Sequence, residues 1–549
     1  MVKAACANSL WWLASAPSHA AFSSALNDPG AAQQRVLRAF LGKNSSTAFG
    51  REHGLHEVRT PAEFARRVPI RNYDELRPWI DRIRRGEPQV LTADPVTRLV
   101  PTSGSTAARK LIPYTAAMHR QLNRAIGPWI FDLYRSYPRA LLGLSYWSIS
   151  PVSEDAIQSA EESAVPIGFE DDSAYLGPFR KSLISASMAV PSELRHVTAI
   201  DDWRYLSALL LLRRRDLSLV SVWHPFFFSL LLKVIRDNWA QLLSDIASGK
   251  CAAIDRLPPL VAASIKSRPN ARRREELHGI SQPTFDRLWP NLKVLSCWAD
   301  GHAAGAADEL AQALASAVVQ PKGLIATEGI ISVPFEGHHP LAILSHYLEF
   351  EADSGCIVLS SELQENQQYN VILTTGGGLC RYRLDDRIAV DGMLGRTPSI
   401  RFVGKSAQVS DRMGEKLSDG FVASVFSKLF CDLQTKPSFA MLAPDVDADG
   451  CRYTLYLSGE APNEVCSTLD RLLSANPHYA YCRRLTQLRP PRLFRVSDDV
   501  NAAYYERLQR TGKRLGEIKP VGLSALDGWS DHLSGHYAPE GPILRHFDP

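Results

Sequence analysis

Short apolar runs of strand character alternate with longer helical runs between residues 140 and 300, and this alternation limits the folds open to the chain. Strands are expected at Ala140–Ile149, Leu217–Trp223 and Leu292–Trp298, and helices at Trp203–Leu212 and Pro225–Asn238. Such alternation is typical of parallel sheets with helices on their faces. We therefore expect an α/β fold built on parallel or mixed sheets.

Two further regions flank this part of the chain. Residues 1 to about 90 carry amphipathic helical spacing at Gln33–Leu41, Pro61–Arg67 and Asp74–Arg85 and form an expected helical cover. Residues 342–405 are expected to form a β-rich subdomain, with strands at Tyr347–Phe350, Cys356–Ser360, Asn370–Thr374, Leu379–Arg383 and Arg387–Val390. Together these regions give an N-terminal domain over residues 1–405.

The pattern restarts after Lys405. Helices are expected at Asp419–Leu433 and Glu464–Leu473, and strands at Tyr453–Ser458 and near Leu493–Val496. We therefore expect a small α+β C-terminal domain over residues 406–549, with the boundary at Lys405–Ser406.

Composition excludes several classes of protein. A formal net charge of +4 on 549 residues gives no support to nucleic-acid binding. The longest apolar region, Leu217–Leu232, contains His224 and Pro225 and is shorter than the ~18 apolar residues of a membrane span. Nine scattered cysteines without a C-x-x-C pair indicate reduced thiols, so we expect a cytoplasmic protein without a membrane partner. Nothing in the sequence points to an obligate protein partner.

A run of hydroxyl and small residues follows the strand expected around Leu99. The run is Pro101-Thr102-Ser103-Gly104-Ser105-Thr106-Ala107-Ala108-Arg109-Lys110. Its backbone amides and hydroxyls suit phosphate oxygens, and Lys110 adds a positive charge. The G-x-x-x-x-G-K-[ST] pattern of ordinary kinases and ATPases is absent. A polar turn without a ligand is the structural alternative.

Two more motifs follow apolar runs. The sequence Trp298-Ala299-Asp300-Gly301 ends one expected strand, and its glycine would let a purine lie against the backbone. Thr327 and Glu328 end another apolar run, where ligands of open α/β sheets bind. We expect Asp300, Gly301 and Thr327 to contact the nucleotide and Glu328 to bind Mg²⁺ beside its phosphates. A buried turn at Trp298 and a solvated glutamate are the alternatives.

A glycine turn and a charged strand form the fourth motif, Thr374-Thr375-Gly376-Gly377-Gly378-Leu379-Cys380-Arg381-Tyr382-Arg383-Leu384-Asp385-Asp386. A carboxylate such as that of Asp386 can accept hydrogen bonds from both ribose hydroxyls. The glycines also suit a simple tight hairpin.

Two lysines complete the candidate residues. Lys405 lies at the expected domain joint, where a basic residue can pair differently in two domain orientations. Lys519 lies in the glycine-flanked segment Gly512–Pro520, and a lysine from a mobile domain can neutralise charge at an attacked α-phosphate. An exposed lysine without a catalytic role is the alternative.

With these motifs in order, the chain resembles the acyl-adenylate-forming superfamily and, more closely, the bacterial branch of the auxin-responsive Gretchen Hagen family of acyl-acid amido synthetases. The marks are TSGSTAARKLIPYT at Thr102–Thr115, SVWHPFF at Ser221–Phe227, LWPNLKVLSCWADG at Leu288–Gly301, ATEG at Ala326–Gly329 and TTGGGLCRYRLDD at Thr374–Asp386. The resemblance covers nearly the whole chain. It implies a large N-terminal domain that binds ATP, Mg²⁺ and an acid, and a small C-terminal domain that rotates between two half-reactions.

By position, the resemblance assigns Ser103, Ser105, Thr106 and Lys110 to the phosphate loop, Glu328 to the magnesium and Asp386 to the ribose. The chain departs from the superfamily at Ala107, Leu324, Asp385 and Lys405, where glycine, an aromatic residue, glycine and arginine are usual. Ala107 restricts positive φ but leaves the hydroxyls in place. Lys405 keeps the charge of arginine and loses its bidentate fork.

The resemblance implies an ATP-dependent ligase that adenylates a small carboxylic acid and transfers the acyl group to an amine, by analogy that of an amino acid. Transfer to coenzyme A or to a carrier-protein thiol is an alternative, and so is a nucleotide-binding protein without catalysis. Candidates for the acid pocket are aromatic or flexible residues that also suit the core, namely Tyr146, Trp147, Met188, Trp223 and Phe226.

Overall fold

The computed structural model describes residues 2–102, 110–148, 163–168, 178–265, 268–280, 285–300, 303–405, 409–410, 412–413, 415–447, 450–462, 464–497, 500–510 and 521–539. The chain divides into two compact units. The first comprises Met1–Leu384 and Ile388–Arg401, and the second comprises Asp385–Arg387 and Phe402–Pro549. Each unit has its own hydrophobic core.

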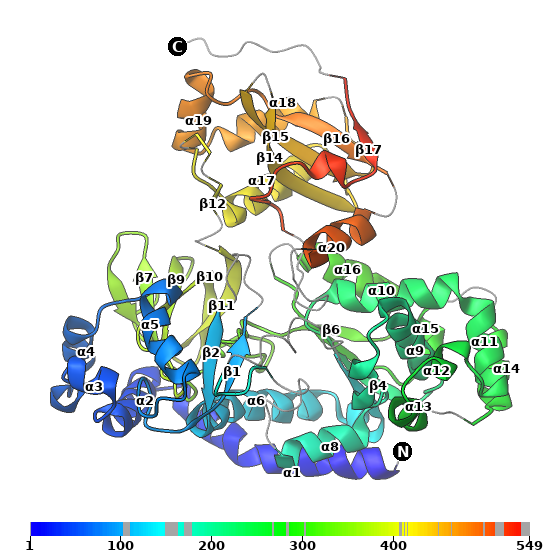
Figure 1. Ribbon diagram of the computed structural model, residues 1–549, viewed down its shortest axis with the longest axis horizontal. Coiled ribbons are helices and arrows are strands. Elements are labelled where there is room, and N and C mark those ends of the chain that lie inside the picture. Colours follow the sequence, from blue (N-terminus) through cyan, green and yellow to red (C-terminus); the bar gives the residue numbers. More distant parts are fainter. Residues whose placement is uncertain are drawn as a thin grey trace. The chain divides into compact units, whose positions relative to one another are not determined.

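A four-stranded parallel sheet lies in the first unit (Figure 1). Its order is β3 (Leu144–Trp147), β4 (Leu217–Ser221), β5 (Val294–Cys297) and β6 (Val318–Pro321). Neighbouring residues of β4 face different cores. Leu219 packs with α1 (Val2–Ala25) and α6 (Ala116–Ser136), and Val220 packs with α9 (Ile200–Leu212) and α10 (Pro225–Asp237). Helices therefore cover both faces, as expected for the parallel sheet of an α/β fold.

Four α-helices lie between α1 and an antiparallel hairpin in the first unit. They are α2 (Pro29–Asn44), α3 (Ala48–Glu52), α4 (Pro61–Arg67) and α5 (Tyr73–Arg84). Capping boxes at Thr60 and Asn72 begin α4 and α5, which satisfies the free amide groups of their first turns. The antiparallel hairpin that follows joins β1 (Val96–Pro101) to β2 (Leu111–Thr115).

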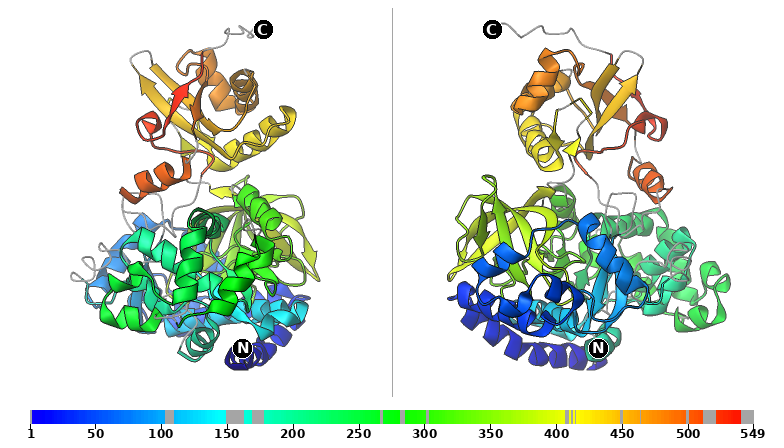
Figure 2. Two further views of the ribbon diagram at one scale, coloured as in Figure 1. Left: turned by 90° about the vertical axis from the view of Figure 1, so that its right-hand side faces the viewer. Right: turned by 60° about the vertical axis from the view of Figure 1, so that its left-hand side comes forward.

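A five-stranded sheet forms the β-rich part of the chain. Its order is β11 (Thr397–Lys405), β10 (Tyr382–Leu394), β9 (Gln368–Thr374), β7 (Tyr347–Ala352) and β8 (Ile357–Leu359). The blue helical segment lies beside this yellow-green sheet in Figure 2. Gln33 of α2 holds the two together, because its amide donates to the carbonyls of Ile343 and His346 at 2.8 Å and accepts the N–H of Leu348 at 2.7 Å.

Two expectations differ from the observed elements. The strand expected over Ala140–Ile149 begins only at Leu144, after a 3₁₀ turn at Pro138–Leu142 and Gly143. A Cβ atom at Gly143 would lie 2.4 Å from the carbonyl oxygen of Asp216, so glycine is needed at this close approach. The strand expected at Leu379–Arg383 begins only at Tyr382, and it continues without a break through the strand expected at Arg387–Val390 to form β10 (Tyr382–Leu394). The alternation of buried and more exposed side chains runs on through Asp385.

The second unit is built on a four-stranded sheet in the order β14 (Phe439–Asp447), β15 (Gly450–Ser458), β16 (Arg492–Val496) and β17 (Gly535–Tyr537). Helices α17 (Asp419–Asp432) and α18 (Val465–Leu473) bury leucines against it. These helices confirm the sequence expectation closely, whereas β14 was not expected. Across both units, no described helix is long and apolar enough to cross a membrane.

Candidate active site

The expected phosphate loop is the connection of the β1–β2 hairpin. The N–H of Thr102 donates to the carbonyl of Lys110 at 2.9 Å, so the two ends of the loop lie side by side. Ser103, Gly104, Ser105 and Thr106 lie outside the described residues. The half-buried Lys110 ammonium donates to the hydroxyl of Tyr382 at 3.4 Å, which joins the hairpin to the start of β10.

Glu328 lies at the tip of a two-residue turn. Ala326 and Gly329 exchange two backbone hydrogen bonds, at 3.0 and 3.2 Å, and Thr327 and Glu328 form the tip between them. The side chain of Glu328 is 8% exposed. A Cβ atom at Gly329 would lie 2.9 Å from Nε2 of His346, so the turn packs closely on the imidazole ring.

The glycine turn of the fourth motif packs against protein backbone. A Cβ atom would lie 2.8 Å from the amide nitrogen of Met118 at Gly376 and 2.3 Å from the carbonyl oxygen of Pro113 at Gly377. Gly378 has a φ of +99°, a conformation that favours glycine. These glycines therefore bring the turn onto β2 and the start of α6.

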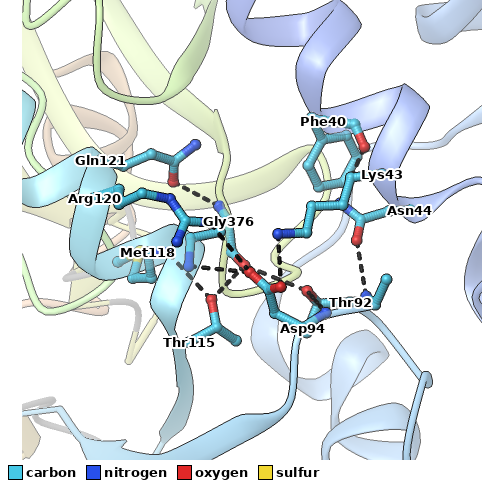
Figure 3. A network of polar contacts seen from close by, with 12 residues as sticks. Phe40, Lys43, Asn44, Thr92, Asp94, Thr115, Met118, Arg120, Gln121 and Gly376 are labelled. Carbon is cyan, nitrogen blue, oxygen red and sulfur yellow. Dashed lines mark hydrogen bonds and ion pairs between the residues drawn. The ribbon is translucent and has the colours of Figure 1, made fainter.

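One hydrogen-bond network joins the glycine turn to α6 (Figure 3). The hydroxyl of Thr115 accepts the N–H of Met118 at 3.1 Å and donates to the carbonyl of Gly376 at 2.8 Å. The side-chain oxygen of Gln121 accepts the N–H of Gly376 at 2.6 Å. The same oxygen lies 3.0 Å from Nδ1 of His346. Because that oxygen is an acceptor, Nδ1 carries the hydrogen and Nε2 is the unprotonated nitrogen of the ring.

The network thus connects three of the expected motifs. Lys110 leads into β2, Thr115 at the end of β2 and Gln121 of α6 hold the glycine turn, and His346 links Gln121 to the turn of Glu328. Burial lowers the pKa of His346 to about 3, so the ring is neutral at physiological pH. Sequence reasoning missed Gln121 and His346, since neither lies in a motif.

A buried ion pair fixes the start of β10. Arg381 donates to the carboxylate of Glu349 on β7 at 2.9 Å and to the carbonyl of Val68 at 2.7 Å. Its φ is +45°, a strained value for a residue other than glycine. The pair holds the chain in this conformation just before Tyr382, the residue that contacts Lys110. Asp386 follows on the same strand and is 4% exposed.

The second motif ends β5. Asp300 follows the strand, and its carbonyl accepts the indole N–H of Trp298 at 2.9 Å and the N–H of Ala303 at 3.1 Å. The carbonyl of Asp300 is therefore hydrogen-bonded within the turn. Gly301 lies outside the described residues.

The acid-pocket candidates divide between the two faces of the parallel sheet. Tyr146 is fully buried and packs against Phe228 in the core below α9 and α10, with ring centroids 6.4 Å apart. Phe226 is half-buried in the first turn of α10, and Met188 is half-buried beside Ser145. Two other candidates, Trp147 and Trp223, both lie near the ammonium of Lys322.

The side chains of the two candidate lysines of the C-terminal region lie outside the described residues. Lys405 ends β11, but its side chain lies outside the description, and Lys519 falls wholly outside the described residues.

Three protein domains match consecutive parts of the chain. The GH3 family N-terminal domain matches residues 18–316, the GH3 family central domain matches residues 340–405, and the GH3 family C-terminal domain matches residues 426–525.

Individual relatives agree with these matches. A putative indole-3-acetic acid-amido synthetase, GH3.10 of Oryza sativa subsp. japonica, is 25% identical over 407 residues, covering 69% of this chain and 78% of that protein. The indole-3-acetic acid-amido synthetase GH3.2 of Arabidopsis thaliana is 23% identical over 448 residues, covering 74% of this chain and 80% of that protein. The solved structure of the AtGH3.15 acyl acid amido synthetase in complex with 2,4-DB shares the fold, with a TM-score of 0.80, 19% identity and coverage of 94% of this chain and 96% of that one.

Proposed function

The chain belongs to the GH3 (Gretchen Hagen) family, and from this premise we propose that it couples a small carboxylic acid to an amino acid at the expense of ATP, releasing AMP and pyrophosphate. The family expected from the five motifs is thereby confirmed. The observation that supports the chemistry best is the contact between the Lys110 hairpin, the Glu328 turn and the glycine turn through Gln121 and His346.

In the proposed first half-reaction a carboxylate oxygen bonds to the α-phosphorus of ATP. The bond from that phosphorus to the oxygen bridging it to the β-phosphorus breaks, and pyrophosphate leaves. Such a reaction needs positioning and positive charge more than covalent help from the protein. We assign the phosphates to Ser103, Gly104, Ser105, Thr106 and Lys110, the base to Asp300, Gly301 and Thr327, and the ribose to Asp386.

Glu328 suits Mg²⁺ bound together with the nucleotide. In nucleotide sites Mg²⁺ is usually held by one or two carboxylates together with phosphates and waters. Glu328 lies at the tip of a tight turn and is buried, and its carboxylate would be one such ligand. When bound there, the ion neutralises phosphate charge.

In the proposed second half-reaction the amine nitrogen of an amino acid attacks the acyl carbon. The bond from that carbon to the AMP oxygen breaks, and the amine loses a proton as the amide forms. We assign residues 406–549 to a mobile domain, Lys405 to its joint and Lys519 to the attacked α-phosphate. We also propose that the protein acts in the cytoplasm, because Cys6, Cys356 and Cys431 are exposed free thiols. We propose as well that it needs no obligate partner protein.

ATP–pyrophosphate exchange with a panel of aryl, indolyl and aliphatic acids tests the first half-reaction. Exchange that depends on one acid supports it. AMP release on addition of amino acids or hydroxylamine, in the absence of any thiol, then supports amide formation. Release that requires coenzyme A would overturn the choice of acceptor, and absence of exchange in folded, ATP-binding protein would overturn the proposed adenylation.

We predict that Glu328→Gln lowers acid-dependent exchange by about 10²–10³-fold, because the amide cannot balance the charge of the metal. The variant should also need more Mg²⁺ for half-maximal exchange. Glu365→Gln, which changes an exposed glutamate of the same unit, is the matched control and should behave as wild type. Unchanged turnover and Mg²⁺ dependence in Glu328→Gln would remove the metal assignment.

A further inference from the structure

A single side-chain oxygen joins two segments that lie far from it in the sequence. Oε1 of Gln121 on α6 accepts the N–H of Gly376, 255 positions away, at 2.6 Å, and it lies 3.0 Å from Nδ1 of His346, 225 positions away. A carbonyl oxygen has two lone pairs, so one atom can accept both hydrogen bonds. The main chain of Gln121 adds a third contact, because its carbonyl accepts the hydroxyl of Ser345 at 2.9 Å.

The position of Gln121 is fixed by the start of α6. The carboxylate of Asp94 accepts the N–H of Ala117 at 3.1 Å (Figure 3). The hydroxyl of Thr115 accepts the N–H of Met118 at 3.1 Å. Gln121 follows Met118 by three residues and therefore lies on the same side of the helix. An anchored helix end thus presents the Gln121 amide to both distant segments.

Both donors to the Gln121 side chain are shielded from water. Gly376 is buried, and the side chain of His346 is fully buried. The other ring nitrogen of His346, Nε2, has no hydrogen-bond partner among the described residues, so the bond to Gln121 is the one that orients the ring there. A buried donor that loses its acceptor destabilises the structure around it. Removal of the Gln121 oxygen would therefore favour a shift of both segments.

The His346 ring supports the turn that carries Glu328. A Cβ atom at Gly329 would lie 2.9 Å from both Nε2 and Cδ2 of the ring, so the backbone of the turn packs directly on it. Gly329 and Ala326 exchange the two backbone hydrogen bonds that close this turn. Because buried groups are close-packed, a rotation of the ring displaces the turn. The position of Glu328 thus depends on the Gln121 oxygen.

The glycine turn, which the same oxygen holds, supports Lys110 from two sides. A Cβ atom at Gly377 would lie 2.3 Å from the carbonyl oxygen of Pro113 on β2, the strand that begins directly after Lys110. After the turn, the hydroxyl of Tyr382 accepts a hydrogen bond from the Lys110 ammonium at 3.4 Å. A shift of the glycine turn would therefore displace the candidate phosphate-binding lysine.

We infer that Gln121 is a positioning residue that couples the glycine turn to the turn of Glu328, so that ATP and Mg²⁺ strengthen each other's binding. The inference rests on the proposed ATP and Mg²⁺ site and adds to it a residue that lies outside every motif. Gln121 acts through the two turns. When one ligand orders its turn, the shared oxygen favours the ordered position of the other turn, and such coupling is reciprocal.

Binding of ATP to the full-length protein, measured in Mg²⁺ and in EDTA, tests the coupling. The readout is the Kd in EDTA divided by the Kd in Mg²⁺, which requires neither an acid nor an amino acid. Gln121→Met keeps the length of the side chain and removes the acceptor, and we expect it to lower this ratio by about 5- to 10-fold. Gln121→Glu keeps an acceptor oxygen and should retain most of the ratio. Gln367→Met, at an exposed glutamine of the same unit, should match wild type.

A double variant separates positioning from a merely structural role. Once Glu328→Gln has removed the carboxylate, Gln121→Met should change the ratio little further, because its effect passes through Glu328. A merely structural role would lower the melting temperature and leave the ratio as in wild type. Gln121→Asn, whose shorter side chain cannot reach both donors, should act as Gln121→Met does and decides the matter if Gln121→Met fails to fold.

Three results would overturn the inference. One is a folded Gln121→Met protein with the ratio of wild type, whether or not wild type itself favours Mg²⁺. Another is an equal loss in Gln121→Glu and Gln121→Met, and the third is full additivity with Glu328→Gln. A ratio that falls in Gln121→Met, in a protein without acid-dependent exchange, would leave the coupling standing and contradict the proposed function instead.

Discussion

At the scale of single residues, the buried His346 makes the stability of the native protein depend on pH. Burial lowers its pKa to about 3, whereas an unfolded histidine titrates near 6.5. Below pH 6.5 the unfolded chain therefore binds a proton that the native protein does not, and native stability falls as the pH drops from 6.5 towards 3. The loss from this one group is at most about 1.4 kcal/mol per pH unit.

We predict that His346→Asn flattens this dependence. The asparagine amide can still donate to Gln121 but does not titrate, so the free energy of unfolding should fall less steeply by about 1 kcal/mol per pH unit between pH 6 and 4.5. Urea unfolding at several pH values measures the slope. His338→Asn, at an exposed histidine, should leave the slope as in wild type. Parallel slopes for His346→Asn and wild type would show that His346 is protonated in the native state.

At the scale of elements, the glycine turn is where β2, α6 and β10 meet. A Cβ atom at Gly377 would lie 2.3 Å from the carbonyl oxygen of Pro113, which is backbone and cannot rotate away. We predict that Gly377→Ala lowers the free energy of unfolding by about 1–3 kcal/mol and raises the KM for ATP, because β2 must shift next to Lys110. Denaturant unfolding and the exchange assay measure the two effects.

Gly392→Ala is the matched control for this substitution. Gly392 lies on β10, and a Cβ atom there has no neighbour within 4 Å. The stability of the Gly392→Ala protein should equal or slightly exceed that of wild type, since alanine restricts the conformations of the unfolded chain. Equal stability of the two variants would show that the turn at Gly377 can accommodate a Cβ atom without a loss in the free energy of unfolding.

The elements also show which parts of the fold a sequence can predict. Helix α10 spans Pro225–Asp237 against an expected Pro225–Asn238, because proline and apolar periodicity are local signals. The start of β10 depends on a contact that is distant in the sequence. The strand begins directly after Arg381, which is held by a buried ion pair with Glu349, 32 positions earlier in the chain. His346 gave no signal for the same reason, since its partner Gln121 lies 225 positions away.

At the scale of the whole molecule, the two half-reactions differ in the charge that they develop. Adenylation builds negative charge at the α-phosphate, and amide formation instead expels AMP from an acyl carbon. Removing a lysine that neutralises this charge should therefore slow adenylation and leave amide formation unchanged. We predict that Lys519→Ala lowers ATP–pyrophosphate exchange by about 10²–10³-fold, while ATP binding and the conversion of supplied acyl adenylate to amide stay as in wild type. Lys436→Ala, at an exposed lysine of the second unit, should change none of these. Equal losses in both half-reactions would instead assign Lys519 to holding the adenylate, which both half-reactions share.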